Sequence, residues 1–247
     1  MKYLIVGNLH TRLYKLERME KAEKPDVVIL LGDYFDGYGV GTVARDETIS
    51  FIKNNLDNKK YVFLLGEQDV QYLWPTEVTA CANFKHGVFL SVDEKIAESD
   101  AIKKFKWYYW LDEKTLLSHA GLSRWWLDTL EVPKEKIHSW LRAEEKECWK
   151  NLFDNKLNWM YAAGRNSGGK IDCGGLTWCH PGEFVPIPGI NQVYAHSFTN
   201  KLRSCYVQGY NYGLGNEMEL YITYDTETES LSVKNYSTLL RNHYESL

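Results

Sequence analysis

The stretch "DVVILLGDYFDG", residues 26–37, decides how the chain is read. A run of β-branched and apolar residues ends in Gly32, which is the pattern of a buried strand that runs into a tight turn. Two carboxylates, Asp33 and Asp36, follow at once. An Asp after a Gly is more often a turn former or a helix cap than a ligand. The interpretation of these two acids therefore depends on what the rest of the chain places beside them.

The same strand pattern occurs on both sides of this stretch. Residues 2–7, "KYLIVG", and residues 61–66, "YVFLLG", are further apolar runs that end in Gly. Between the three runs, residues 11–24 and 42–56 carry apolar side chains on one helical face, and Pro25 ends the first of these helices. The alternation of strand and helix predicts right-handed βαβ units and a parallel sheet covered on both faces.

The order of the predicted elements changes in the second half of the chain. Two strands flank a turn at residues 112–114, and residues 124–163 have a helical pattern rich in Trp, Leu, Glu and Lys. This segment is expected to form a lobe with the Trp and Leu side chains in its core. A Gly-rich loop at 164–175 lacks the Lys-Ser/Thr ending of a P-loop and follows a helix, so a P-loop is excluded. Residues 189–197 form one more strand, which leads to His196.

The C-terminal segments at 202–210, 218–225 and 230–236 predict an antiparallel set of strands. No repeat, low-complexity tract or linker divides the chain. We therefore expect a single domain over residues 1–247, with a helical insertion at about 124–163.

Composition excludes several classes of protein. Of 247 residues, 44% are hydrophobic and 25% are charged, which is typical of a soluble globular protein. The net charge of −4 opposes bulk binding of nucleic acid but leaves room for a local basic pocket. The start of the chain lacks the pattern of a signal peptide, and no run reaches the roughly 18 apolar residues of a membrane span. We expect a cytoplasmic protein without membrane contact.

Cysteines and aromatic residues each leave an alternative open. The five cysteines are odd in number and irregularly spaced, which favours free thiols in a reducing compartment. Cys173, Cys179 and His180 also suggest zinc, but no further Cys pair completes four ligands. The 9 Trp and 17 Tyr residues favour core packing, with a stacking surface for a base or ring as the alternative.

Polar residues gather directly after the predicted strands. In parallel sheets, ligands bind beyond the carboxyl ends of the strands, so side chains that are distant in sequence converge there. Five strand ends each offer a possible ligand, which is difficult to attribute to turn chemistry alone. Carboxylates combined with imidazoles suit Mn, Fe, Zn or Ni better than an all-oxygen Ca or Mg site. The residues are Asn8, His10, Asp33, Asp36, Glu67, Gln68, Asp69, His119 and His196.

The order and spacing of these residues resemble the calcineurin-like metallophosphoesterases. The likeness extends over about residues 1–200, and it is greatest to the branch that contains serine/threonine phosphoprotein phosphatases and their bacterial and phage relatives. It implies an α/β fold, an α+β sandwich in which two mixed β-sheets are flanked by helices. The matching motifs are "GNLH" (7–10), "GDYFDGYG" (32–39), "GEQD" (66–69), "HAGLS" (119–123) and "AHSFT" (195–199).

The resemblance implies a site for one or two divalent ions. Family members use two ions about 3.5–4 Å apart to activate a water molecule as nucleophile. The ligands implied at the first position are Asn8, His10 and Asp33, and those at the second are Asp33, Glu67, His119 and His196.

Two of these ligands depart from the family pattern. Asn8 stands where the family has Asp, and Glu67 stands where it has Asn, so the formal ligand charge is kept. We expect a retained metal site, with manganese as the first choice. Because a carboxylate binds a hard cation better than an amide oxygen does, we also expect unequal occupancy with a tighter second position.

Other departures concern catalysis. Gln68 replaces the His that protonates the departing oxygen, and a loss of this kind is worth about 10²–10⁴ in rate. Asp36 matches the carboxylate that orients this His, and it is expected to hold Gln68 instead. Two phosphate-clamping arginines are replaced by Gly37 and Leu65. Arg165 is either a substitute clamp or a solvated loop residue, and His180 and Arg203 are further loop candidates.

Two functions follow from this pattern. The first is a metal-dependent phosphoesterase with a degenerate site, which acts on a phosphorylated small molecule or phosphoprotein with a good leaving group. The second is a catalytically impaired phosphatase-fold protein that binds a phosphorylated ligand or a protein partner without turnover. The fold alone does not distinguish them.

Overall fold

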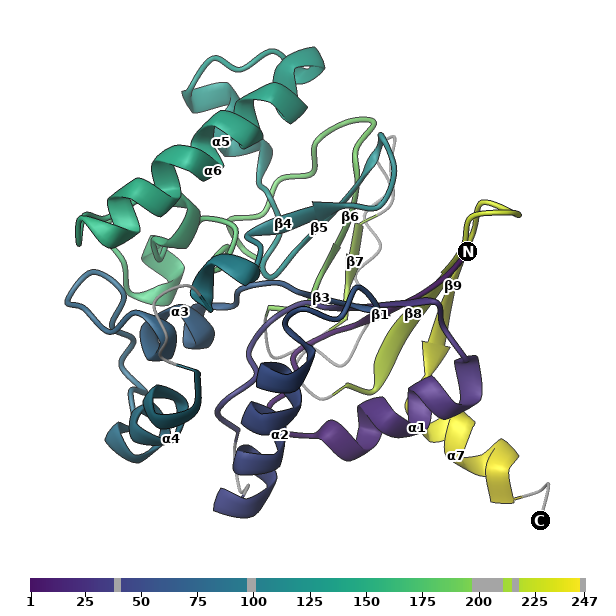
Figure 1. Cartoon of the computed structure of the whole chain (residues 1–247). Coiled ribbons are helices and arrows are strands. Elements are labelled where there is room, and N and C mark those ends of the chain that lie inside the picture. Colours follow the sequence, from purple (N-terminus) through teal and green to yellow (C-terminus); the bar gives the residue numbers. More distant parts are fainter. Residues whose placement is uncertain (38–40, 97–100, 197–210, 215–217, 245–247) are drawn as a thin grey trace.

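The computed structural model describes residues 1–37, 41–96, 101–196, 211–214 and 218–244. Its first sheet has the strand order β3-β2-β1-β8-β9 (Figure 1). The first three strands are parallel, β8 is antiparallel to β1, and β9 is antiparallel to β8. This confirms the predicted βαβ start and the antiparallel C-terminal strands. The strands are β1 (Lys2–Val6), β2 (Val27–Leu30), β3 (Tyr61–Phe63), β8 (Leu220–Asp225) and β9 (Ser230–Asn235).

The second sheet has the order β4-β5-β6-β7. Strands β4 and β5 are the predicted antiparallel pair, whereas β5, β6 and β7 are parallel. The strand predicted at 202–210 lies outside the described residues. Two mixed sheets flanked by helices confirm the expected α/β fold. The strands are β4 (Tyr108–Trp110), β5 (Thr115–Ser118), β6 (Asn191–Tyr194) and β7 (Asn211–Gly213).

Alternation along the strands explains why both faces of the first sheet are buried. Successive side chains of a strand point to opposite faces. In β1, Leu4 belongs to the buried cluster that includes Leu16 of the first helix. Its neighbour Ile5 belongs to a second buried cluster with Leu117 of β5 and Val193 of β6. One face therefore packs against helices and the other against the second sheet.

The helices agree with the sequence in part. The predicted helices are α1 (Leu13–Glu23), which ends at a left-handed Lys24 before Pro25, and α2 (Thr42–Asn55). Three helices were not expected: α3 (Glu67–Leu73), α4 (His86–Ile96) and α7 (Tyr236–Tyr244). Figure 1 shows α7 beside α1, on the helical side of the first sheet. A short 3₁₀ helix, η1 (Ile102–Lys104), precedes β4.

The predicted lobe is helical but interrupted. It contains α5 (Arg124–Thr129), η2 (Lys134–Lys136), α6 (Ile137–Phe153) and η3 (Trp159–Tyr161). Its Trp rings pack on one another, with ring centroids of Trp126 and Trp159 4.7 Å apart and those of Trp140 and Trp159 5.3 Å apart. These contacts agree with a packing role for the aromatic residues. The single-domain assignment stays a prediction.

Two further expectations concern membrane contact and the state of the cysteines. No helix in the described part of the chain is both long and apolar enough to cross a membrane, and the cytoplasmic location stays a prediction. The four cysteines within the described ranges are free thiols, namely Cys81, Cys148, Cys173 and Cys179.

Candidate metal centre

The loops after β1 and β2 run side by side and bring the first candidate ligands together. The backbone N–H of His10 donates to Asp33 O (2.8 Å), and that of Thr11 donates to Tyr34 O (3.0 Å). His10 (φ 41°), Thr11 (φ 60°) and Asp33 (φ 55°) all adopt left-handed backbone conformations. Such conformations are costly for residues other than Gly and cluster at functional sites. The local fold thus accepts strain where Asn8, His10 and Asp33 meet.

Two glycines allow the strand ends to approach closely. A Cβ on Gly66 would lie 2.3 Å from Asp33 Oδ1 and 2.9 Å from His119 Cε1. Gly32 has a φ of +109°, and a Cβ there would lie 2.7 Å from His119 Nδ1. Any side chain at either position would displace these groups. The glycines before Asp33 and Glu67 are therefore a packing requirement of the site.

Asp69 organises the backbone of the site, a role that was not predicted from the sequence, where it was only one of the polar residues after the strands. Its fully buried carboxylate accepts N–H bonds from Asp33 (2.7 Å), Tyr34 (2.8 Å) and Gly66 (2.8 Å). Burial raises the pKa of Asp69 to about 7, and the three donors oppose this shift. The signal available in the sequence was its place three residues after Gly66, the position of an acid in a capping box.

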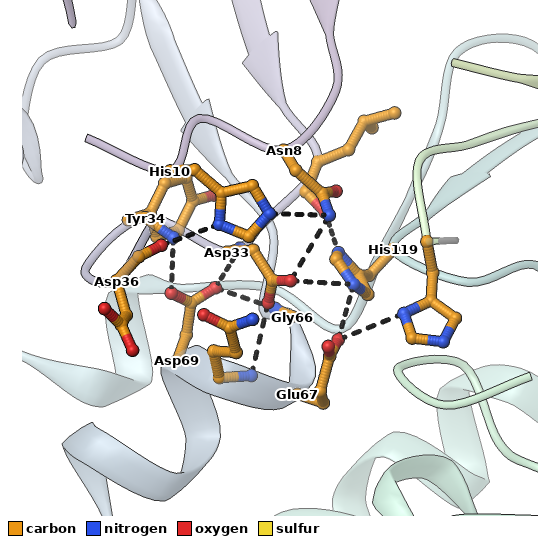
Figure 2. Close-up of polar contacts among 12 residues, drawn as sticks. Asn8, His10, Asp33, Tyr34, Asp36, Gly66, Glu67, Asp69 and His119 are labelled. Carbon is orange, nitrogen blue, oxygen red and sulfur yellow. Dashed lines mark hydrogen bonds and ion pairs between the residues drawn. The ribbon is translucent and has the colours of Figure 1, made fainter. Parts of the chain in front are cut away.

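The residues predicted for the second metal position converge. Ligand atoms of Glu67, His119 and His196 all lie within 4.8 Å of one another. Glu67 Oε2 lies 2.6 Å from His119 Nε2 and 3.3 Å from His196 Nδ1. Asp33 Oδ2 lies 3.6 Å from His119 Nε2 (Figure 2). Strand ends from both sheets therefore contribute to one cluster.

The donor atoms of this cluster fit a divalent ion. His119 Nδ1 donates to Leu31 O (2.7 Å), because a carbonyl oxygen only accepts. In its neutral form, His119 would therefore direct the lone pair of Nε2 at Glu67 Oε2. Both atoms are buried, and in that form neither has a hydrogen-bond partner within the described residues. Two lone pairs at this distance require a proton or a cation between them, and a carboxylate with two imidazoles suits a transition metal.

Electrostatics in the cluster point the same way. Burial opposes protonation of His119, but the carboxylates of Asp33 and Glu67 outweigh it and raise the pKa of His119 to about 10. Burial also works against ionised Glu67, but His196 and His119 lower the pKa of Glu67 well below its usual value. Burial and the charge of Glu67 together raise the pKa of Asp33. The cluster thus attracts positive charge.

The first metal position has a different arrangement. The Asn8 Nδ2 group donates to Asp33 Oδ2 (3.3 Å) and lies 3.5 Å from His10 Nε2. His10 Nδ1 donates to Asp36 O (2.7 Å), which leaves Nε2 as the acceptor that faces the amide. Burial lowers the pKa of His10, which favours this neutral form. An amide N–H donor thus stands between two groups that were predicted to hold an ion.

The expectation that Asp36 holds Gln68 is wrong. The carboxylate of Asp36 accepts from Lys85 Nζ (2.9 Å) and from Tyr72 OH (3.3 Å). An ammonium group binds a carboxylate more strongly than a neutral amide does, so Lys85 takes this position. The side-chain oxygen of Gln68 is buried and has no hydrogen-bond partner in the described part of the chain, although its backbone N–H donates to Asp33 Oδ1 (3.2 Å).

The loop candidates lie apart from this network. Arg165, at the start of η4 (Arg165–Ser167), pairs with Asp172 (2.8 Å), and its side chain is 70% exposed. An exposed ion pair of this kind is typical of a solvated loop residue, and the role of Arg165 as a phosphate clamp stays a prediction. His180 Nδ1 accepts from the backbone N–H of Gly182 (3.0 Å), and Arg203 lies outside the described residues. Within the described ranges, the zinc alternative at Cys173, Cys179 and His180 forms no cluster of metal-ligand atoms.

Comparison with known proteins defines the family. The calcineurin-like phosphoesterase family matches residues 1–197, which is most of the chain. The protein belongs to this family, whose members bind divalent metal ions and hydrolyse phosphoesters. The branch within the family, including the phosphoprotein-phosphatase and bacterial or phage type, stays a prediction. No curated protein matches the chain.

Several solved structures are similar to the chain at low identity. The phosphoesterase Yfce from E. coli is 12% identical, with a TM-score of 0.44, and the match covers 96% of this chain and 100% of Yfce. A metallophosphoesterase from Sphaerobacter thermophilus is 12% identical, with a TM-score of 0.44 and coverage of 98% and 94%. A serine/threonine phosphatase from Saccharomyces cerevisiae is 13% identical, with a TM-score of 0.32 and coverage of 49% and 38%. At these scores the likenesses carry no argument about the site.

Proposed function

We propose that the protein is a phosphoesterase that works with one tightly held divalent ion, for which manganese is the first choice. The proposal rests on one contact, the 2.6 Å approach of Glu67 Oε2 and His119 Nε2, which needs a proton or a cation between the two atoms. With His196 and Asp33 beside them, these atoms would hold the ion. An ion bound there would supply Lewis-acid polarisation of a phosphate group and would lower the pKa of a water molecule.

The arrangement at the first metal position favours a protein that holds a single ion, at the second position. The amide of Asn8 places an N–H donor against Asp33 and His10, where an ion needs lone pairs. A cation at this place would have to displace a donor from a buried acceptor, which costs free energy. The first position is therefore the weaker one.

The residues around the site favour substrates with a good leaving group. Gln68 has no proton to give at neutral pH, and Asp36 is engaged by Lys85 and Tyr72. A departing alkoxide needs a proton, whereas an aryl oxide or a phosphate departs without one. The substrate class proposed is thus a small molecule with an activated phosphate.

A second candidate function is a binding protein that holds a phosphorylated ligand or a protein partner without turnover. The observation that favours it is the joint loss of three catalytic side chains, at Gln68, Gly37 and Leu65. Retention of a ligand in chemically unchanged form would distinguish this protein from a hydrolase.

Metal content and turnover, measured together, test the proposal. Purified protein is loaded with Mn²⁺, analysed for elements, and assayed on p-nitrophenyl phosphate and glycerol phosphate. We expect one ion per chain, multiple turnover of the aryl phosphate, and turnover of the alkyl phosphate that is slower by about 10² or more. Glu67→Ala is expected to lose both the ion and the turnover. A metal-loaded protein that leaves both esters intact would reject the hydrolase in favour of the binding protein.

A further inference from the structure

A pocket opens next to the first position of the candidate metal centre. It has a volume of about 190 Å³, several times the roughly 30 Å³ that a water molecule takes up in the liquid. Two of its lining residues are tied to the first metal position: Thr11 follows His10 directly, and the backbone oxygen of Asp36 accepts from His10 Nδ1. The lining also includes Gly37, Arg45 and Lys85.

Two cationic side chains from different elements line this pocket. Arg45 comes from α2, and Lys85 immediately precedes α4, and these two helices pack against each other. Together with Asp36, the lining carries two positive charges and one negative charge. A pocket with surplus positive charge, built on packed helices, is suited to an anion.

Arg45 carries a buried donor atom, Nε, that has no acceptor in the described part of the chain. A buried donor on a charged group is costly to leave unpaired, so this atom favours an incoming acceptor. Lys85 differs, because it pairs with Asp36 and its side chain is 53% exposed. An anion could therefore accept from Arg45 and from the remaining N–H groups of Lys85.

We propose that Arg45 and Lys85 form a subsite for a second phosphate group, so that the substrate class is a phosphoanhydride such as pyrophosphate or a nucleoside diphosphate. This inference rests on the proposed function and makes it more specific. The described residues that line the pocket do not include Glu67, His119 or His196, so the pocket is separate from the second metal position. The scissile phosphate would lie at the ion and the leaving phosphate in the pocket.

The reaction balances without a proton donor at Gln68. The oxygen of a water molecule forms a bond to the scissile phosphorus, and the bond from that phosphorus to the bridging oxygen breaks. The electron pair of the broken bond stays on the leaving phosphate, whose added charge faces Arg45 and Lys85. The two phosphate products and the solvent take up the protons of the consumed water. Cationic stabilisation of the leaving group thus takes the place of its protonation.

Binding of pyrophosphate, measured by calorimetry on metal-loaded protein, tests the subsite. We expect Arg45→Gln and Lys85→Ala each to weaken pyrophosphate binding by about tenfold or more, because each removes a charged hydrogen-bond partner. Binding of orthophosphate, which lacks a second phosphate group, should fall much less. Lys53→Ala removes an exposed cation from the same helix as Arg45 and is expected to leave pyrophosphate binding unchanged. Unchanged metal content in each variant verifies that the fold is intact.

The binding test of the subsite is independent of the turnover test of the hydrolase. Arg45→Gln and Lys85→Ala proteins that bind pyrophosphate as tightly as the wild type would overturn the subsite, even if the wild type hydrolyses aryl phosphates. Weakened binding in both variants would support the subsite, even if the wild type proves to hold pyrophosphate without cleaving it. Should Arg45→Gln fold poorly, Arg45→Lys is the second variant. It keeps the positive charge but loses the planar guanidinium group, and it is expected to retain part of the affinity for pyrophosphate.

Discussion

Glu67 Oε2 lies 2.6 Å from His119 Nε2 in a buried place. The other ring nitrogen donates to Leu31 O, so Nε2 of the neutral imidazole has only a lone pair to direct at the carboxylate. In the metal-free protein the raised pKa of His119 places a proton between the two atoms, and a divalent ion would take the place of that proton. Such a contact is stable only with positive charge between them, which links the preference for an ion to the direction of a single hydrogen bond.

Glu67→Gln is expected to weaken both metal binding and the metal-free fold. The variant removes a carboxylate ligand and should lose the ion, and it also removes a charge partner of the protonated His119, so its metal-free form should be less stable by about 3 kcal/mol. Elemental analysis and denaturant unfolding in the presence of chelator measure the two effects. Glu227→Gln, at an exposed position, should change neither. A Glu67→Gln protein that retains a full equivalent of ion would contradict the proposed ligand set.

Asn8→Asp is expected to create a second ion site. The new carboxylate would face Asp33 Oδ2, which now accepts from the Asn8 amide at 3.3 Å, and a cation between the two would relieve their repulsion. Calorimetric titration with Mn²⁺ should change from one to two ions per chain. Asn8→Ala removes the amide donor without adding charge, and it should stay at one ion. Equal stoichiometry in Asn8→Asp and the wild type would show that the amide is not what weakens the first position.

Gly66→Ala is expected to destabilise the protein by about 1–3 kcal/mol, since a methyl group there would overlap Asp33 Oδ1 and crowd His119. Thermal unfolding of metal-free protein measures the effect on the fold, and Mn²⁺ titration measures the effect on the site. The matched control is Gly87→Ala in α4, where an added Cβ meets nothing within 4 Å. Because Ala is the better helix former, the control should be stabilised by up to about 1 kcal/mol.

Glu23 gives the stability a predictable dependence on pH. Burial opposes its ionisation, but Lys234 Nζ (2.7 Å) and Tyr221 OH (2.9 Å) donate to its carboxylate and lower the pKa of Glu23. A pKa lowered by folding stabilises the protein above the unfolded-state value of about 4.3, and this stability is lost as the pH falls through the folded-state pKa.

The test is the pH profile of Glu23→Gln. Its free energy of unfolding should be lower than that of the wild type by about 1 kcal/mol or more at pH 6, and the gap should close below pH 4. Glu17→Gln, at an exposed position of α1, should follow the wild type throughout. A gap that is equally large at pH 3 and pH 6 would assign the effect to packing rather than to charge.

The parts of the fold that were predicted depend on local patterns. The sequence runs that contain β1, β2 and β3 are apolar and each ends in Gly, so their ends could be aligned and their polar residues placed together. Helix α3 was missed because its seven residues are too few to show a helical period. The same shortness hid Asp69, whose three partners are backbone groups from its own strand end and from the end of β2.

The parts of the site that were not predicted depend on contacts between distant residues. Lys85 and Asp36 are 49 positions apart. No local pattern indicates that Asp36 pairs with Lys85 rather than with Gln68. The substitution of Asn8 could be read as a weaker ligand, but not as a donor directed at Asp33 and His10, because the orientation of an amide depends on its neighbours.

The four residues of the second position follow strands of both layers: Asp33 and Glu67 follow β2 and β3, and His119 and His196 follow β5 and β6. An ion held by all four would be a cross-link between the two sheets. Each tenfold rise in free metal above the dissociation constant would add about 1.4 kcal/mol to the free energy of unfolding, shared by both layers. Resistance to heat and to proteolysis would then follow the metal supply of the surroundings, even while no substrate is present.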